Sequence, residues 1–203
     1  MIRNVVFDMG NVLLKFDPEG FMTRAGVTDP EDRRQLLREL FLSVEWALMD
    51  LGALTEDSAE PRVLARLPEH LRGTASHLLR NWAEDREMIP GMEALARRLH
   101  AAGYPLYLLS NASVSQPDYW NRLEISRLFS GTLVSAFVKT VKPGPEIYRL
   151  FIRTFSLREE ECVFIDDSHA NVAGAVACGW HGIVFHGDAE ETERRLRELG
   201  LRF

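Results

Sequence analysis

The chain has 203 residues, of which 46% are hydrophobic and 27% are charged, a composition typical of a folded globular protein with room for a small-molecule site. It excludes a disordered chain, a collagen-like repeat and a disulfide-rich scaffold. The formal net charge of −6 argues against nucleic acid as a partner. Only three of the 24 basic residues are lysine, namely Lys15, Lys139 and Lys142. Each lysine is therefore a candidate for a role that arginine cannot fill.

The cysteine residues and the first segment indicate the compartment. Cys162 and Cys178 lie in apolar surroundings, which favours reduced, buried thiols in a cytoplasmic protein. Residues 1–10 predict a strand rather than a signal peptide. No apolar run approaches the roughly 20 residues of a membrane span. We therefore expect a cytoplasmic protein without a membrane segment, and the sequence does not indicate its oligomeric state.

Five short apolar runs predict the strands of a sheet. They are residues 3–7, 105–109, 133–137, 162–166 and 182–186. The runs are continuous rather than alternating, which is typical of a parallel sheet buried on both faces. Helical patterns separate the later strands, at residues 91–102, 145–155 and 169–178. This alternation predicts an α/β fold, a three-layer Rossmann-like parallel sheet core.

Residues 17–86 interrupt the alternation, because they contain helical patterns and no convincing strand. The predicted helices are 30–42, 44–50, 55–67 and 68–86. Ligands of open α/β sheets bind at the carboxyl ends of the strands. We therefore expect an all-helical cap, residues 17–86, inserted after the first strand of a core formed by residues 1–16 and 87–203.

Polar residues follow four of the predicted strands. In chain order they are Asp8, the pair Ser110 and Asn111, Lys142, and the pair Asp166 and Asp167. Taken singly, each has an ordinary explanation, such as a loop acid, a Ser/Asn turn or a solvated charge. Taken together, they predict one site at the edge of the sheet where the strands end.

The charges of these residues suit a magnesium-bound phosphate monoester. Mg²⁺ prefers hard oxygen ligands, which Asp8, Asp167 and the carbonyl of Gly10 could provide. The three aspartates balance Mg²⁺ and Lys142 in charge, so the assembled site can accept an anion. The expected partner is a small phosphorylated molecule.

The four segments FDMGNVLL, LLSN, VKPGPEIY and FIDDSHANVAGA, in this order, resemble the motifs of the haloacid dehalogenase-like (HAD) hydrolases. That family consists mostly of phosphatases that work through an aspartyl-phosphate. The resemblance spans nearly the whole chain, and residues 17–86 stand where the family inserts its C1-type cap. The DxGN form of the first motif is similar to a subgroup that includes α-D-glucose-1-phosphate phosphatases, which makes a sugar phosphate a candidate substrate.

The resemblance implies a role for each matching position. Asp8 would be the nucleophile, and Lys142 would bridge it and the phosphate. Ser110 and Asn111 would hold a phosphate oxygen.

The resemblance also implies the metal ligands. Asp167 would bind Mg²⁺ directly, whereas Asp166 would do so through water or would orient the site. Gly10 would offer its carbonyl, and Asn171 would support the loop.

Gly10 departs from the family pattern. Most family phosphatases carry a second aspartate there, which protonates the leaving oxygen and later activates water. Such general acid–base catalysis is worth about 10²–10⁴-fold in rate. A phosphatase would then need a substrate with an undemanding leaving group, or an acid from water or from the cap, where Glu45 and Asp50 are candidates.

Two other functions remain open. The dehalogenase branch also lacks the second aspartate and acts on 2-haloacids, but it needs no metal, so Asp166 and Asp167 argue against it. A non-catalytic relative that binds a phosphorylated ligand is the other alternative. The intact Asp8, Lys142 and Asp167 argue against such decay. Trp46 and Met49 could face either the substrate or the core of the cap, and residues 119–122 could border the pocket.

Overall fold

The computed structural model describes residues 1–82, 84 and 86–203. It confirms an α/β fold around a five-stranded parallel sheet, whose strand order is β3-β2-β1-β4-β5. The strands are β1 Asn4–Phe7, β2 Leu106–Ser110, β3 Phe129–Val134, β4 Cys162–Asp166 and β5 His181–Val184. In this order the chain switches sides between β1 and β4, the place where open parallel sheets form their ligand crevice.

The predicted strand 133–137 is wrong in position. β3 ends at Val134, and the helix α8 Ser135–Val138 follows it. The first half of β3 lies at the edge of the sheet and alternates between partly buried and exposed residues, so it shows no continuous apolar run. Gly131 lies in this half, and the position suits glycine because a Cβ there would stand 2.2 Å from the ring of Phe155.

Helices cover both faces of the sheet. They are α6 Met92–Ala101, α7 Gln116–Trp120, α8, α9 Pro145–Phe155, α10 His169–Ala177 and α11 Ala189–Glu198, with short 3₁₀ turns at Glu124–Leu128 and Glu159–Glu161. The predicted helices 91–102, 145–155 and 169–178 are confirmed to within a residue at each end. Pro145 occupies the first turn of α9, and Gly103 follows α6 with φ 88°.

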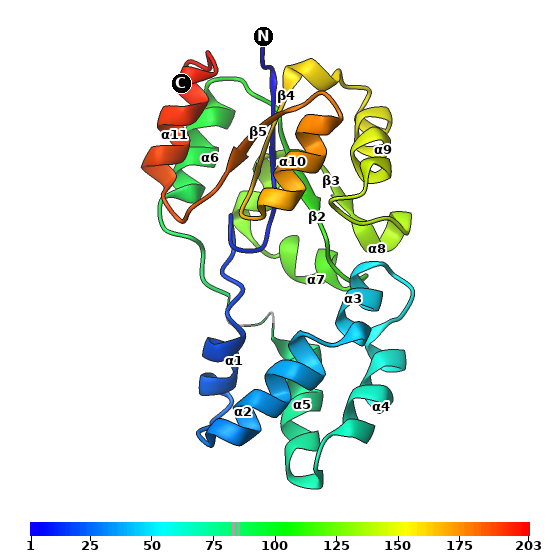
Figure 1. The fold of residues 1–203 in the computed structure, drawn as a ribbon. Helices are drawn as coiled ribbons and strands as arrows, with labels where there is room; N and C mark the ends of the chain where they lie inside the picture. Colours follow the sequence, from blue (N-terminus) through cyan, green and yellow to red (C-terminus); the bar gives the residue numbers. More distant parts are fainter. Residues whose placement is uncertain (83, 85) are drawn as a thin grey trace.

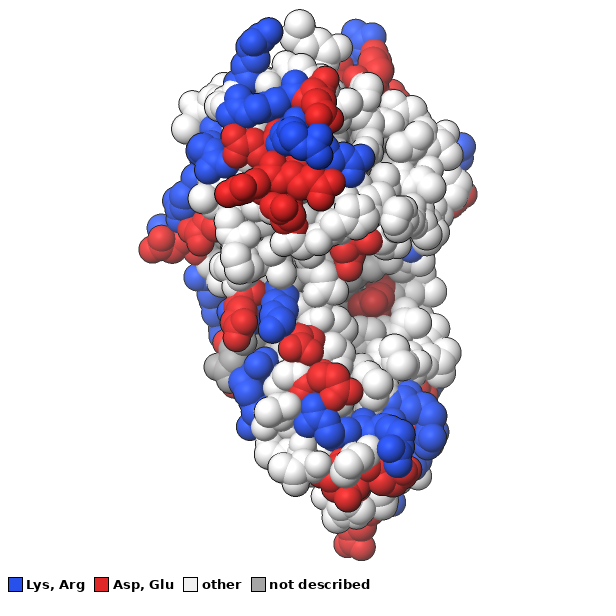
Figure 2. Space-filling view, turned by 60° about the vertical axis from the view of Figure 1, so that its left-hand side comes forward, with Lys and Arg blue, Asp and Glu red and all other residues white. Residues whose placement is uncertain are grey.

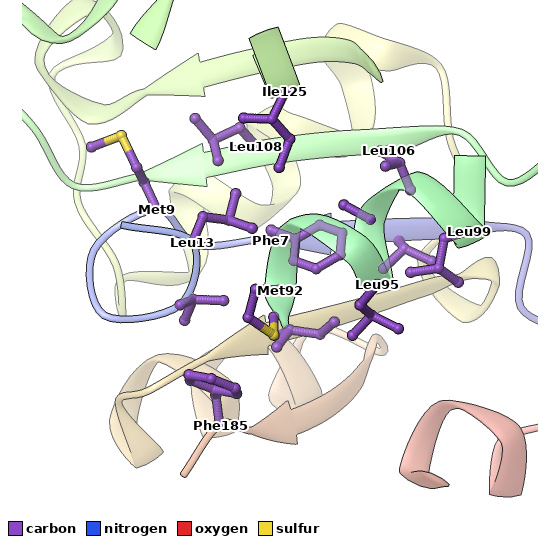
Figure 3. Packing of buried hydrophobic residues seen from close by; sticks show 14 of the residues in the cluster. Phe7, Met9, Leu13, Met92, Leu95, Leu99, Leu106, Leu108, Ile125 and Phe185 are labelled. Carbon is purple, nitrogen blue, oxygen red and sulfur yellow. The ribbon is translucent and has the colours of Figure 1, made fainter. Parts of the chain in front are cut away.

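Alternate residues of the strands point to opposite helical layers. Phe7 of β1 packs with Met92 and Leu95 of α6 (Figure 3), and Val5 belongs to the same hydrophobic cluster. Val6 packs on the other face with Phe151 of α9. Since both faces of β1 are buried, Val5, Val6 and Phe7 are all apolar up to the carboxyl edge, and the one polar residue of the strand, Asn4, lies at its opposite end.

Residues 17–82 form a helical unit with a hydrophobic cluster of its own. Its helices are α1 Pro18–Arg24, α2 Pro30–Leu36, a π-helical turn Leu37–Phe41, α3 Val44–Asp50, α4 Glu56–Arg66 and α5 Glu69–Asn81. The single helix predicted at 30–42 is wrong, because the backbone widens into the π turn after Leu36. α1 is an additional helix, capped by the Asp17 side chain and started by Pro18. The predicted helix 68–86 ends at Asn81, and the prediction for positions 83 and 85 lies outside the described residues.

The helical unit lies at the carboxyl edge of the sheet. β1 runs from the N-terminus toward it, and both chain termini lie at the opposite end of the molecule (Figure 1). Basic and acidic side chains intermingle on the face shown in Figure 2, which also shows an acidic side chain in the hollow between the two halves. Among the described residues, no helix has the length and apolar character needed to cross a membrane.

Candidate active site

Lys142 joins two of the strand ends. Its Nζ lies 2.8 Å from Oδ1 of Asp8, which follows β1, and 2.7 Å from Oδ2 of Asp166, the last residue of β4. It also donates a hydrogen bond to the carbonyl of Leu109 in β2. The Lys142 side chain is only 1% exposed. Three neighbouring strands therefore fix the ammonium group beside the Asp8 carboxylate.

Asp166 uses both carboxylate oxygens within the protein. Besides Lys142, it accepts hydrogen bonds from the backbone N–H of Ser168 at 2.8 Å and from Nδ2 of Asn171 at 3.0 and 3.1 Å. These contacts connect Lys142 to the start of α10. In this geometry Asp166 positions its neighbours, while Asp167 is the exposed member of the pair.

Asn111 holds the lysine loop. Its amide Oδ1 accepts a hydrogen bond from the backbone N–H of Lys142 at 2.9 Å, and its Nδ2 donates to the carbonyl of the same residue at 3.0 Å. Ser110 is buried at the end of β2 and lines the same cavity as Asp8. The two residues predicted as a phosphate-binding pair thus lie beside the acid cluster, and Asn111 also fixes the backbone of Lys142.

Three carboxylates gather at this edge. Oxygen atoms of Asp8, Asp166 and Asp167 lie within 4.8 Å of one another. Burial raises the pKa of Asp8, against the opposing effect of Lys142, and Asp166 raises it further. Burial also raises the pKa of Asp167, again with a contribution from Asp166. Hard oxygen donors that repel one another and have one ammonium group between them fit a divalent cation such as Mg²⁺.

The acid cluster forms the base of a cavity of about 210 Å³. Gly10, Asn11 and Asn171 line it from the core. The residues that line it from the other side come from the helical unit and from the two segments that connect it to the sheet, and they are mostly apolar. They are Phe16, Trp46, Met49, Asp50, Glu56, Leu79, Trp82 and Arg86. The cavity therefore has a charged base and a largely apolar wall.

Aromatic rings build this wall. The ring centroids of Phe16 and Trp82 are 5.1 Å apart, and those of Trp46 and Trp82 are 5.5 Å apart. The guanidinium carbon of Arg86 lies 3.9 Å from the ring centroid of Trp82 and 3.5 Å from that of Tyr119. Arg86 is thus sandwiched between two rings, a stabilising cation–π arrangement.

Trp46 and Met49 pack against the cluster of the helical unit and also line the cavity, so both alternatives raised by the sequence apply. Tyr119 borders the pocket, as expected of residues 119–122. Sequence reasoning missed Phe16, Trp82 and Arg86. Phe16 and Arg86 lie on the two segments that connect the sheet to the helical unit. This place in the sequence could have indicated that both residues border the cavity.

The two predicted acids of the helical unit differ in their surroundings. Glu45 is paired with Arg66, whose Nη2 lies 2.7 Å from Oε2, and it does not line the cavity. This contact lowers the pKa of Glu45. Asp50 does line the cavity, together with Asp8 and Lys142.

Glu56 links the helical unit to the sheet. Its Oε1 accepts hydrogen bonds from the hydroxyls of Ser113 at 2.6 Å and Ser115 at 2.7 Å, in the loop after β2. Lys139 donates a hydrogen bond to the carbonyl of Gly52. These contacts hold the two halves of the cavity against each other.

A parallel α/β sheet with a lysine-bridged acid cluster at its carboxyl edge defines a Rossmann-like hydrolase. The family model of the haloacid dehalogenase-like hydrolases matches residues 2–179. The chain belongs to this family.

Individual proteins agree with the family. The sesquiterpene phosphatase of Aspergillus oryzae is 24% identical over 203 residues, which cover 97% of this chain and 96% of that protein. The drimenol cyclase of Aspergillus calidoustus is 25% identical over 98% of this chain but only 37% of its own length. Flavin mononucleotide hydrolase 1 of Arabidopsis thaliana is 27% identical over 56% of this chain and 46% of its own length. The chain thus spans less than half of these last two relatives.

Solved structures show the same fold. A predicted HAD-like hydrolase of Porphyromonas gingivalis superposes with a TM-score of 0.72 at 24% identity, with all of both chains covered. A HAD family enzyme of Bacteroides thetaiotaomicron, in complex with magnesium and inorganic phosphate, superposes with a TM-score of 0.73 at 20% identity, covering 92% of this chain and 96% of that one.

Proposed function

We propose that this protein is a Mg²⁺-dependent phosphatase that hydrolyses a small phosphomonoester through an aspartyl-phosphate on Asp8. The observation that carries this proposal is the Asp8 carboxylate held 2.8 Å from the buried Lys142 ammonium at the base of the cavity. A carboxylate that attacks a phosphate dianion needs positive charge nearby to offset the repulsion. Covalent capture then divides hydrolysis into two displacements.

Each remaining residue of the site has a proposed task. Asp8, Asp167 and the carbonyl of Gly10 would hold Mg²⁺, with Asp166 assisting through water or by orientation. The ion supplies positive charge next to the phosphoryl oxygens. Ser110 and Asn111 hold a phosphate oxygen and Lys142 bridges it to Asp8. Asn171 supports the loop through Asp166.

We assign residues 17–86 as the cap and residues 1–16 and 87–203 as the core. The cap closes the cavity with its aromatic wall and excludes water from it. The Glu56 contacts with Ser113 and Ser115 support a closed position. The free thiols of Cys162 and Cys178 fit the expected cytoplasmic location.

The wall favours a substrate with an apolar or aromatic face. The relatives include phosphatases of a sesquiterpene and of glyceraldehyde 3-phosphate, and a flavin mononucleotide hydrolase. A sugar phosphate also stays a candidate, because the C–H face of a sugar can pack on the rings of Trp46 and Trp82. All of these molecules carry a phosphate group, so the charged base of the cavity does not select among them.

The test is phosphate release from a panel of esters, with and without Mg²⁺. The panel contains glucose 1-phosphate, glyceraldehyde 3-phosphate, flavin mononucleotide, an isoprenoid monophosphate and 4-nitrophenyl phosphate. We expect turnover of at least one ester, abolished by a chelator and restored by Mg²⁺. Asp8→Asn should lower the rate by on the order of 10⁴-fold or more while the protein stays folded.

Other outcomes separate the alternatives. Halide release from 2-haloacids without metal would identify a dehalogenase. Binding of phosphate esters without turnover of any of them would identify a non-catalytic relative. Mg²⁺ should also raise the melting temperature of the wild type, and much less that of Asp167→Asn, because the ion relieves repulsion among the carboxylates.

A further inference from the structure

The acid cluster contains no residue free to protonate a leaving group. Gly10 has no side chain, both oxygens of Asp166 are hydrogen-bonded, and Asp167 faces the proposed metal position. The alcohol that leaves a phosphomonoester nevertheless needs a proton. The donor must therefore come from elsewhere on the cavity wall.

Beyond the acid cluster and Lys142, the titratable side chains of described residues that line the cavity are Lys15, Asp50, Glu56, Arg86 and Tyr119. Lys15 is paired with Asp17 and Glu87, and the guanidinium of Arg86 does not release a proton in proteins. Glu56 is engaged by the hydroxyls of Ser113 and Ser115. Burial raises the pKa of Tyr119, so its hydroxyl is too weak an acid for this task. Asp50 remains, and none of the hydrogen bonds between described residues involves its carboxylate.

The backbone of Asp50 is fixed relative to the phosphate-binding loop. Its carbonyl accepts a hydrogen bond from the hydroxyl of Ser135, which is fully buried at the start of α8. The same hydroxyl accepts from the N–H of Ala112 at 3.0 Å, one residue after Asn111. A single side chain thus ties the end of α3 to the loop that follows β2.

Gly52 allows this close approach. Its φ is 70°, and a Cβ there would stand 2.1 Å from the carbonyl oxygen of Ala136 and 2.7 Å from Nζ of Lys139. The turn after α3 therefore lies directly on α8 and carries Asp50 to the cavity. Burial raises the pKa of Asp50 to about 7, against the opposing charge of Lys142. Its proton is thus available near neutral pH.

We propose that Asp50 is the general acid and base of the reaction, acting from the helical unit in place of the side chain missing at Gly10. This inference rests on the proposed phosphatase function. In the first step an Asp8 oxygen bonds to phosphorus, the bond from phosphorus to the ester oxygen breaks, and that oxygen takes the proton of Asp50. In the second step water attacks phosphorus and gives a proton to the Asp50 carboxylate. The bond from phosphorus to Asp8 then breaks, which releases inorganic phosphate and restores both carboxyl groups.

The experiment compares two esters of similar size with the variant Asp50→Asn. Benzyl phosphate has an alcohol leaving group that needs a proton, whereas the leaving group of 4-nitrophenyl phosphate does not. In Asp50→Asn we expect benzyl phosphate turnover to fall by about 10²–10⁴-fold. The first turnover of 4-nitrophenyl phosphate should remain fast. It should appear as a stoichiometric burst, because hydrolysis of the aspartyl-phosphate has lost its base.

Asp57→Asn is the matched control, because Asp57 lies on the outer side of the same unit with its side chain 83% exposed. It should leave the rates with both esters unchanged. The double variant Gly10→Asp/Asp50→Asn provides a rescue, since a Cβ at Gly10 meets no atom of the described residues within 4 Å. We expect it to raise benzyl phosphate turnover above that of Asp50→Asn, whereas the first turnover of 4-nitrophenyl phosphate, which is already fast in Asp50→Asn, should change little.

The possible failures are distinguishable. If the wild type turns over esters but Asp50→Asn slows the first turnover of both esters equally, or slows neither, the assignment of Asp50 is overturned and the phosphatase stands. A double variant that accelerates the first turnover of both esters by the same factor would also count against it. If the wild type turns over no ester at all, the proposed function itself fails.

Discussion

The two sides of the cavity are built in opposite ways. On the sheet side, Lys142, Asp8, Asp166 and Asn111 form a network of short polar contacts fixed by strand ends. On the helical side, Phe16, Trp46 and Trp82 form an apolar wall. If the protein is the proposed phosphatase, the strand ends would hold the phosphate and the metal, whereas the helices would select the substrate and supply the proton through Asp50.

The energetic consequences of this division differ as well. Removing one partner of the buried charge network leaves another charge unpaired, which costs about 3–5 kcal/mol. Removing a ring from the wall loses packing and stacking, worth about 0.5–1.5 kcal/mol per aromatic pair beyond the buried area. Substitutions on the sheet side should therefore affect every substrate, and substitutions on the helical side should affect substrates selectively.

Among the substitutions that compare the two sides of the cavity, the largest effect is expected from Lys142→Arg, compared with Lys139→Arg. A guanidinium is a wide planar fork, and the 1% exposed position between Asp8 and Asp166 holds a compact ammonium. We expect Lys142→Arg to lower kcat by about 10²–10³-fold. Lys139 is exposed, and among the described residues its ammonium donates a hydrogen bond only to the carbonyl of Gly52, so Lys139→Arg should change kcat little.

Steady-state kinetics of both variants provide the measurement, and circular dichroism establishes that each one is folded. Equal losses in the two variants would mean that Lys142 has no special role and survives in an arginine-rich chain by accident of composition.

The sheet side was largely predictable from the sequence, and the reason is geometric. Buried parallel strands are continuous apolar runs, and the polar residue that ends each run lies at the common edge. Asp8, Ser110 and Asp166 follow this rule directly. Lys142 follows a loop after α8, yet the turn there still carries it to the same edge. β3 was misplaced because an edge strand with Gly131 lacks the apolar signal.

The helical side was less predictable. Local capping signals exist, such as Asp17 before Pro18, but they do not show which face of a helix meets the cavity. Arg86 illustrates the limit, since its sandwich between Trp82 and Tyr119 depends on a contact across 33 residues of sequence. Asp50 and Glu45 lie on the same short helix, α3. Only the folded structure shows that Asp50 lines the cavity whereas Glu45 is paired with Arg66.

An intermediate effect on kcat/KM, selective for esters that contain a ring, is expected from Trp46→Leu. The leucine keeps an apolar side chain in the helical cluster but removes the ring that faces Phe16 at 5.7 Å and Trp82 at 5.5 Å. For benzyl phosphate we expect kcat/KM to fall about tenfold, mainly through KM, which corresponds to about 1.4 kcal/mol. Glyceraldehyde 3-phosphate, which has no ring to stack, should be affected much less. A loss of the same size for both esters would contradict a selective wall.

The smallest effect is expected from Glu45→Gln, which concerns stability alone. Hydrogen bonds from Arg66 lower the pKa of Glu45 below its ordinary value of 4.5, so the ionised carboxylate stabilises the folded state. A carboxyl group whose pKa is lower in the folded than in the unfolded state stabilises the fold at pH values above its unfolded-state pKa. This stabilisation is lost as the pH falls through the folded-state pKa. Because the Arg66 side chain is 37% exposed, solvent screens the pair, and we expect about 1 kcal/mol at pH 7. The melting temperature of the variant should be about 2–4 °C lower at pH 7. The difference should narrow as the pH falls below 4.5, whereas a constant difference down to pH 3 would show that packing rather than charge holds Glu45 in place.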